Sequence, residues 1–159
     1  MRILISACLL GQKCKYNGGE NYSEAAAEYC RGHEVFAVCP EVAGGLPVPR
    51  IPSEIVDGIV MNARGENVDR AFRSGAERCL RIAAEKRIDL AILKSRSPSC
   101  GVKQVYDGTF SGKLVQGSGV FAELLKAHGF RVVDAEELVG PSTAAGAAFG
   151  EPSENPEKP

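Results

Sequence analysis

Three of the six cysteines in this chain follow short apolar segments that are typical of buried strands. Cys8 follows residues 2–7, Cys39 follows residues 34–38, and Cys100 comes shortly after a third apolar run. In an open α/β sheet, the carboxyl ends of parallel strands converge on the crevice where ligands bind. The sequence therefore indicates that three thiolates could meet around one metal centre.

Thiolates are soft ligands, and they select zinc or an iron–sulfur cluster over hard cations. The wide spacing of these three differs from the paired Cys-x-x-Cys knuckles of zinc ribbons and from the compact run of ferredoxins. The site must therefore be assembled by the fold. A cluster held by only three cysteines leaves one iron without a protein thiolate, and that iron could act as a Lewis acid toward a substrate atom.

The other cysteines suggest different roles. Cys79 lies on the apolar face of a predicted helix and is expected to be a buried small side chain, and the same is expected of Cys30. Cys14 shares a loop with Cys8, and either of them could be a ligand. Cys8 is favoured because it directly ends a strand.

An acid and two hydroxyl groups stand next to these cysteines. Glu41 is two residues from Cys39, and Ser97 and Ser99 precede Cys100. A carboxylate near a metal centre can activate water or shuttle a proton. The alternative is that Glu41 is a solvated loop residue and that the serines form a turn around a proline.

Composition and charge limit the class of protein. The chain has 159 residues, of which 44% are hydrophobic and 25% charged, as expected for one globular domain. Its net charge is -1, and Lys and Arg are dispersed, so no basic stripe for a nucleic-acid polymer is present. No run approaches the roughly 18 apolar residues of a membrane helix. We expect a cytoplasmic protein, in which cysteines more often bind metals, catalyse reactions or are buried than form disulfides.

Strands and helices alternate along most of the chain, which predicts a Rossmann-like three-layer α/β domain with a mainly parallel sheet of about four strands. The predicted domain covers residues 1–139, and residues 140–159 are a predicted low-complexity disordered tail. The predicted strands are 2–7, 34–38, 90–93 and 131–134, and the predicted helices are 23–31, 69–86 and 118–128.

Two segments interrupt this alternation. Residues 40–52 are rich in Pro and Gly, and we expect no regular structure there. Residues 105–110 predict a hairpin built on an Asp-Gly turn. Within the first segment, Arg50 stands between prolines and could present its donor fork to a carbonyl or phosphate of a substrate. A structural salt bridge, for example to Glu54, is an equal alternative.

Residues 117–122 match the Gly-x-Gly-x-x-Ala form of the dinucleotide-binding fingerprint. The stretch before them is too short and polar for the central strand that this motif requires. We therefore expect the start of a helix there, and no dinucleotide site.

Six motifs occur in order along residues 1–138: SACLLG at 6–11, CKYNG at 14–18, CPE at 39–41, GGLPVPRIPSE at 44–54, LKSRSPSCG at 93–101 and YDGTFSG at 106–112. This series resembles the bacterial domain-of-unknown-function family that includes the thiouracil desulfidases, in its short, stand-alone form. The resemblance implies that Cys8, Cys39 and Cys100 hold a [4Fe-4S] cluster and that Glu41 and Ser97 take part in catalysis. Asn17 departs from the aspartate that the second motif carries in the family.

The activity that this resemblance implies is removal of sulfur from a thiolated pyrimidine such as 2- or 4-thiouracil, to give uracil and sulfide without net redox change. The substrate would be a small molecule, either the base, its nucleoside or its nucleotide. Two alternatives are a zinc hydrolase that uses the same three cysteines and a non-catalytic iron–sulfur sensor or binding module.

Overall fold

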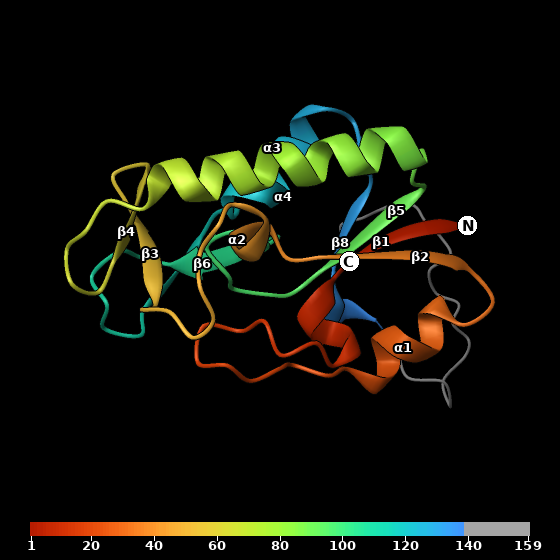
Figure 1. Cartoon of the computed structure of the whole chain (residues 1–159), viewed down its shortest axis with the longest axis horizontal. Helices are drawn as coiled ribbons and strands as arrows, with labels where there is room; N and C mark the ends of the chain where they lie inside the picture. The colour runs from red at the N-terminus through yellow and green to blue at the C-terminus, as the bar shows by residue number, and fades with distance from the viewer. Residues whose placement is uncertain (139–159) are drawn as a thin grey trace.

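A four-stranded parallel sheet forms the centre of the molecule (Figure 1). The computed structural model describes residues 1–138, so the predicted tail at 140–159 lies outside the described residues, and the division into domain and tail stays a prediction. The strand order is β2-β1-β5-β8. The four strands are β1 (Arg2–Ser6), β2 (Glu34–Val38), β5 (Leu90–Leu93) and β8 (Val132–Asp134), within a residue or two of the predicted bounds.

Strand β1 is central and apolar on both faces, as expected for a parallel strand covered by two layers. Its residue Ile3 pairs with Val35 of β2 and with Leu90 of β5. Because side chains alternate along a strand, Leu4 packs into the core cluster on one face, while Ile3 and Ile5 pack into the cluster on the other. The sheet therefore divides the core in two.

Helices cover both faces of the sheet, which confirms the predicted three-layer α/β fold (Figure 1). One face is covered by α3 (Asp69–Lys86) and α4 (Val120–Ala127). The other face is covered by α1 (Glu24–Cys30) and the short helix η1 (Ala7–Leu10), and a second short helix, η2 (Ala135–Glu137), ends the described chain.

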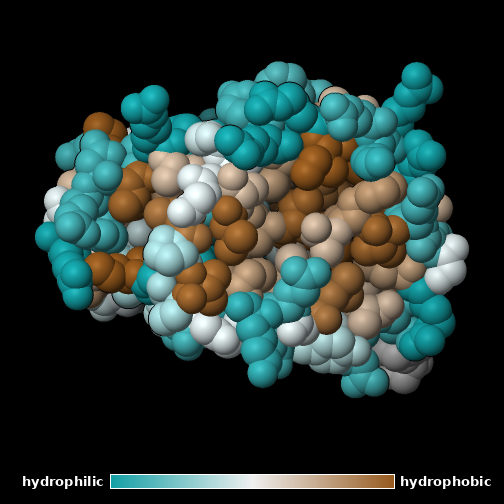
Figure 2. All heavy atoms as spheres, in the orientation of Figure 1, coloured by the Kyte–Doolittle hydropathy of each residue, from teal (hydrophilic) through white to brown (hydrophobic). Residues whose placement is uncertain are grey.

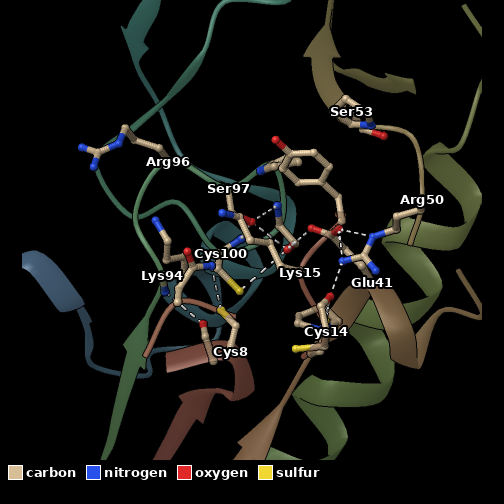
Figure 3. A pocket seen from close by; sticks show the side chains of 18 of the residues that line it. Cys8, Cys14, Lys15, Glu41, Arg50, Ser53, Lys94, Arg96, Ser97 and Cys100 are labelled. Carbon is tan, nitrogen blue, oxygen red and sulfur yellow. Dashed lines mark hydrogen bonds and ion pairs between the residues drawn. The ribbon is translucent and has the colours of Figure 1, made fainter. Parts of the chain in front are cut away.

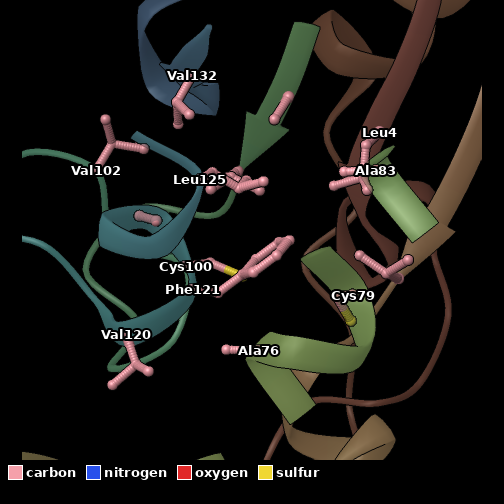
Figure 4. Packing of buried hydrophobic residues seen from close by; sticks show 14 of the residues in the cluster. Leu4, Ala76, Cys79, Ala83, Cys100, Val102, Val120, Phe121, Leu125 and Val132 are labelled. Atoms are coloured by element: carbon pink, nitrogen blue, oxygen red, sulfur yellow. The ribbon is translucent and has the colours of Figure 1, made fainter. Parts of the chain in front are cut away.

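The buried face of α3 is the predicted one. Phe72, Ala76, Cys79 and Ala83 are buried at helical spacing, and Leu80 is half-buried against the same cluster (Figure 4). Hydrophilic side chains cover the outer surface of α3, at the top of the view in Figure 2, and apolar side chains are exposed in the middle of the face below it. None of the helices within residues 1–138 has the length and apolar character of a membrane span.

Local signals in the sequence explain where α1 and α4 begin. The Ser23 hydroxyl accepts a hydrogen bond from the backbone N–H of Ala26 at 3.1 Å, so this serine caps α1. Helix α4 begins after Gly119, which confirms the helix expected at residues 117–122. Ser118 is not its cap, because its hydroxyl donates to the carbonyl oxygen of Val102.

The prediction that residues 40–52 hold no regular structure is wrong at its start. Pro40–Ala43 form a one-turn helix, α2, with proline at the first position. Proline is compatible with that position because the N–H that it lacks would have no partner inside the helix.

Two hairpins lie beside the sheet, and one of them was not predicted. Strands β3 (Ser53–Val56) and β4 (Ile59–Asn62) pair through Asp57 and Gly58, both with positive φ, as a tight two-residue hairpin turn requires. The second hairpin is the one predicted at residues 105–110, but its second strand lies further along the chain than expected. β6 (Gln104–Tyr106) pairs with β7 (Leu114–Gln116), so the Asp-Gly pair begins a longer connection at 107–113.

Candidate active site

A cavity of about 510 Å³ lies at the carboxyl ends of β1, β2 and β5 (Figure 3). Cys8, Cys39 and Cys100 all line it, and so does Cys14. The fold thus brings together three cysteines that are far apart in the sequence, as the positions of the strand ends predicted. Cys30 and Cys79 lie in the core, as expected for structural residues.

Cys8 and Cys39 are placed by short helices that follow the strands. Cys8 lies in η1, directly after β1, and Asn21 donates its side-chain N–H to the Cys8 sulfur at 3.4 Å. Cys39 directly follows β2 and is the N-cap residue of α2. The Cys39 sulfur lies 3.9 Å from the carbonyl oxygen of Cys14, so these two neighbours share one side of the cavity.

Helix α2 is seated by a close approach to α3 that requires glycine on both helices. A Cβ atom at Gly75 would lie 1.7 Å from the carbonyl oxygen of Pro40, and one at Gly44 would lie 2.0 Å from that of Ala71. Real Cβ atoms do not approach backbone oxygens this closely. The position of Cys39 and Glu41 therefore depends on the absence of side chains at Gly44 and Gly75.

Cys100 is placed by a loop that is tied to the start of α4. The backbone N–H groups of Val120 and Phe121 donate to the carbonyl oxygens of Pro98 and Ser99, both at 2.8 Å. These N–H groups have no partner inside the helix, so the loop supplies the acceptors that a helix N-terminus needs. On its inner side, the Ser97 hydroxyl accepts from the backbone N–H groups of Ser99 and Cys100, at 3.0 Å each.

Glu41 is not a solvated loop residue, because only 13% of its side chain is exposed. Its Oε1 atom accepts from Nε of Arg50 at 2.8 Å, and its Oε2 atom accepts from the Ser99 hydroxyl at 2.9 Å. The Ser99 and Ser97 hydroxyl groups lie 3.0 Å apart. Ser97 is thus connected to Glu41 through Ser99, while Ser99 makes the direct contact.

The suggested partner of Arg50 is wrong. Arg50 pairs with Glu41, whereas Glu54 accepts hydrogen bonds from the backbone N–H groups of Gly108 and Phe110 in the β6–β7 connection. The Glu54 carboxylate therefore holds that connection against β3, and it makes no pair with Arg50.

The thiols of this cavity are half-buried or, at Cys100, fully buried, and burial disfavours a thiolate. Burial raises the pKa of Cys8, against the opposing hydrogen bond from Asn21. Burial and the nearby Cys39 raise the pKa of Cys14 to about 12. Burial also raises the pKa of Cys100, against hydrogen bonds from the Ser6 and Ser99 hydroxyl groups. A metal centre replaces the thiol protons on binding and supplies the positive charge that such a site needs.

The spacing of the thiol groups distinguishes a single zinc ion from an iron–sulfur cluster. Within residues 1–138, no three His, Cys, Asp or Glu side chains lie close enough together to hold a single metal ion. Thiolates on one tetrahedral zinc ion are within about 4 Å of one another, given Zn–S bonds of about 2.3 Å. In a cluster each thiolate binds a different iron, so the ligands stand further apart. Three thiols around a shared cavity fit a cluster better than a single zinc ion.

Comparisons with known proteins agree with this site. Residues 3–137 match the model of a family described as 2-thiouracil desulfurase. The chain belongs to the 2-thiouracil desulfurase family. The prediction of an enzyme is thereby confirmed, as is the resemblance seen in the six motifs.

Two relatives illustrate how fully the desulfurase family pattern is shared. An uncharacterised Bacillus subtilis (strain 168) protein, YbbK, is 41% identical over 146 residues, covering 86% of this chain and 97% of the relative. A solved structure titled [4Fe-4S]-dependent thiouracil desulfidase TudS superposes with a TM-score of 0.81 at 39% identity, covering 86% of this chain and 92% of the other.

Sequence reasoning about this desulfurase-family site missed two contacts. The sequence indicates for Ser99 only a turn or a general hydroxyl donor, whereas in the structure its hydroxyl is the group that contacts Glu41. The Arg50–Glu41 pair was also missed. One available signal was that the CPE motif, which contains Glu41, and the GGLPVPRIPSE motif, which contains Arg50, are only a few residues apart.

Proposed function

We propose that this protein removes the thiocarbonyl sulfur from a thiolated pyrimidine such as 2- or 4-thiouracil, as the base, nucleoside or nucleotide. The products are the corresponding uracil and sulfide. The observation that carries the proposal is the convergence of Cys8, Cys39 and Cys100 with Glu41 on one cavity, in a chain of the 2-thiouracil desulfurase family.

The proposed cofactor is a [4Fe-4S] cluster held by Cys8, Cys39 and Cys100. An all-thiol donor set suits iron–sulfur chemistry, and the solved relative TudS is described as [4Fe-4S]-dependent. When bound, a cluster with three cysteine ligands supplies one iron that can act as a Lewis acid toward the thiocarbonyl sulfur. Cys14 is left without a ligand role in this assignment.

The overall reaction is a hydrolysis and needs no oxidant or reductant. A carbon–oxygen bond to water forms, the carbon–sulfur bond breaks, and the protons of water leave with sulfur as hydrogen sulfide. Glu41 is the group that accepts a proton from water or returns one to the ring or the sulfur. Ser97 takes part through Ser99, whose hydroxyl group lies between Ser97 and the carboxylate.

The size and charge of the site suit a small molecule. A cavity of about 510 Å³ is within the range of small-molecule sites. The net charge of -1 over the whole chain gives no general attraction for a nucleic-acid polymer. We therefore propose a free pyrimidine compound as the substrate.

The test is anaerobic incubation of iron-loaded protein with 2- and 4-thiouracil, while the loss of thiocarbonyl absorbance and the release of sulfide are measured. We expect turnover by the brown, iron-loaded protein and about a 100-fold loss or more in Glu41→Gln. The matched control is Glu77→Gln, on the exposed side of α3, which should keep full activity. Turnover with zinc alone, or binding of thiouracil without sulfide release, would contradict the proposal.

A further inference from the structure

The two oxygens of the Glu41 carboxylate have different partners. Oε1 lies 2.8 Å from both Nε and Nη2 of Arg50, and Oε2 accepts from the Ser99 hydroxyl at 2.9 Å. We propose that Arg50 is a positioning residue of the reaction: it holds Oε1, so that Oε2 is the oxygen that exchanges protons at the cavity. This inference rests on the proposed function, because it concerns the residue that orients Glu41 for proton transfer.

The Arg50–Glu41 pair is shielded from solvent, with 7% of the Arg50 side chain and 13% of the Glu41 side chain exposed. A charge-assisted pair of this kind is shorter and more directional than a neutral hydrogen bond. In a buried pair, removing one partner leaves the other charge uncompensated, so its side chain must move or lose its charge. The orientation of Glu41 thus depends on Arg50 far more than the orientation of an exposed glutamate depends on its partner.

Arg50 can impose that orientation because three hydrogen bonds to backbone carbonyl oxygens fix its own position. Nη2 donates to the carbonyl oxygen of Cys14 at 2.8 Å, and Nη1 donates to that of Pro47 at 3.1 Å. The backbone N–H of Arg50 donates to the carbonyl oxygen of Tyr16 at 2.6 Å. The planar guanidinium fork is used at Nε and at both terminal nitrogens, an arrangement that the single ammonium of a lysine cannot reproduce.

The role of Oε2 follows from the chemistry of the two donors. The Arg50 guanidinium keeps its protons under all ordinary conditions, so the oxygen facing it exchanges none. The Ser99 hydroxyl can donate and accept, and it lies 3.0 Å from the Ser97 hydroxyl. Both serines and Glu41 line the cavity (Figure 3). The path from the carboxylate to the reacting groups therefore begins at Oε2.

The experiment compares Arg50→Met and Arg50→Lys with the unaltered protein, all loaded with iron under anaerobic conditions. We expect kcat for thiouracil to fall about 100-fold in Arg50→Met, because a misplaced catalytic group costs about that much, while KM changes less than about threefold. The kcat of Arg50→Lys should lie between those of Arg50→Met and the unaltered protein, because lysine restores the positive charge without the planar donor fork of arginine. The control is Arg31→Met. It removes an arginine from an exposed pair with Glu28 at the end of α1, shortly before the start of β2.

Two further measurements separate positioning from a purely structural role. Iron content and cluster absorbance should match the unaltered protein, and a crystal structure of Arg50→Met should show Glu41 turned away from the Ser99 hydroxyl. Unchanged kcat, or Glu41 still bonded to Ser99 in the variant, would overturn the inference. Loss of iron in parallel with kcat would also overturn it, since Arg50 would then act through retention of the cluster and not through the orientation of Glu41.

The crystal structure also distinguishes this inference from the function on which it rests. If the unaltered protein releases no sulfide, the proposed function fails, whatever the orientation of Glu41. If the unaltered protein is active and Glu41 keeps its place without Arg50, only the positioning role fails.

Discussion

Two walls of the cavity are held in place by different kinds of interaction. The serine wall, residues 97–100, is fixed by backbone hydrogen bonds to the first turn of α4. The arginine wall, formed by Cys14, α2 and Arg50, is fixed by hydrogen bonds from one guanidinium and by the contact of Gly44 and Gly75. In Figure 3 the labelled residues Ser97 and Cys100 lie to the left of Glu41 and Arg50, and the two walls meet where the Ser99 hydroxyl donates to Glu41.

This difference determines how each wall responds to substitution. A backbone hydrogen bond survives most changes of side chain, so a substitution at Ser99 in the serine wall can remove a chemical group without moving the rest. In the arginine wall the interactions belong to one side chain and to two glycines, so a single substitution there changes positions. The chemistry on the serine wall and the geometry on the arginine wall can therefore be altered separately.

The largest effect should come from two of the proposed cysteine ligands: Cys100, in the serine wall, and Cys39, which directly precedes α2 of the arginine wall. We expect Cys39→Ala and Cys100→Ala each to lose most of the bound iron and all sulfide release, because each leaves the proposed cluster with two thiolates. Cys79→Ala, in the core beneath α3, should keep the iron, although it loses some stability. Iron analysis of the three variants is the measurement. Iron retained in Cys39→Ala or Cys100→Ala would exclude that residue as a ligand.

The next largest effect concerns the contact between α2 and α3, which holds the arginine wall in place. In Gly75→Ala, the new methyl group would meet the carbonyl oxygen of Pro40, so α2 must shift away from α3. We expect the free energy of unfolding to fall by about 2 kcal/mol, as in other overpacked sites, together with a lower iron content. Denaturant unfolding and iron analysis measure both.

The control for this variant is Gly117→Ala, where a Cβ atom would make an ordinary 3.4 Å contact with Val105. It should leave stability and iron content nearly unchanged. If Gly75→Ala behaves like Gly117→Ala, the close approach does not hold α2 in place.

A smaller effect is expected from Ser99→Ala in the serine wall. This change removes the hydroxyl that donates to Oε2 of Glu41, but it leaves the Ser99 carbonyl free to accept from α4. We expect kcat to fall about tenfold, with the iron content and the unfolding midpoint close to those of the unaltered protein. Steady-state kinetics and thermal unfolding test this together. A drop in stability as large as that of Gly75→Ala would show that the serine wall depends on side chains after all.

The elements that carry the site could be predicted because each is specified locally. Continuous apolar runs gave the parallel strands, and a period of 3.6 gave α3 with its buried Cys79. Because the carboxyl ends of such strands share one edge, Cys8, Cys39 and Cys100 could be placed on one cavity without any knowledge of contacts. The β3–β4 hairpin was also within reach, since Asp57-Gly58 is a strong turn signal.

The contacts of Glu41 could not be predicted in the same way. Arg50 reaches it from an irregular segment whose path no local pattern specifies, and Ser99 rather than Ser97 faces it because of how the loop is tied to α4. Both outcomes depend on tertiary packing at side-chain level. The one-turn helix α2 escapes prediction for a simpler reason: proline breaks helices in their interior, but it is compatible with the first helical position, where Pro40 lies.

The smallest effect should come from Arg96, the arginine beside the serine wall, and it tests the comparison most directly. Arg96 also pairs with a glutamate, Glu136, but 35% of its side chain is exposed, and the loop that follows it is held by backbone bonds. We expect Arg96→Met to change the free energy of unfolding by less than about 1 kcal/mol, as for other exposed pairs, and to keep the full iron content. Denaturant unfolding of Arg96→Met beside Arg50→Met measures the contrast between the two walls. Equal losses of stability in the two variants would mean that both walls rest on their arginines, and the distinction between them would not hold.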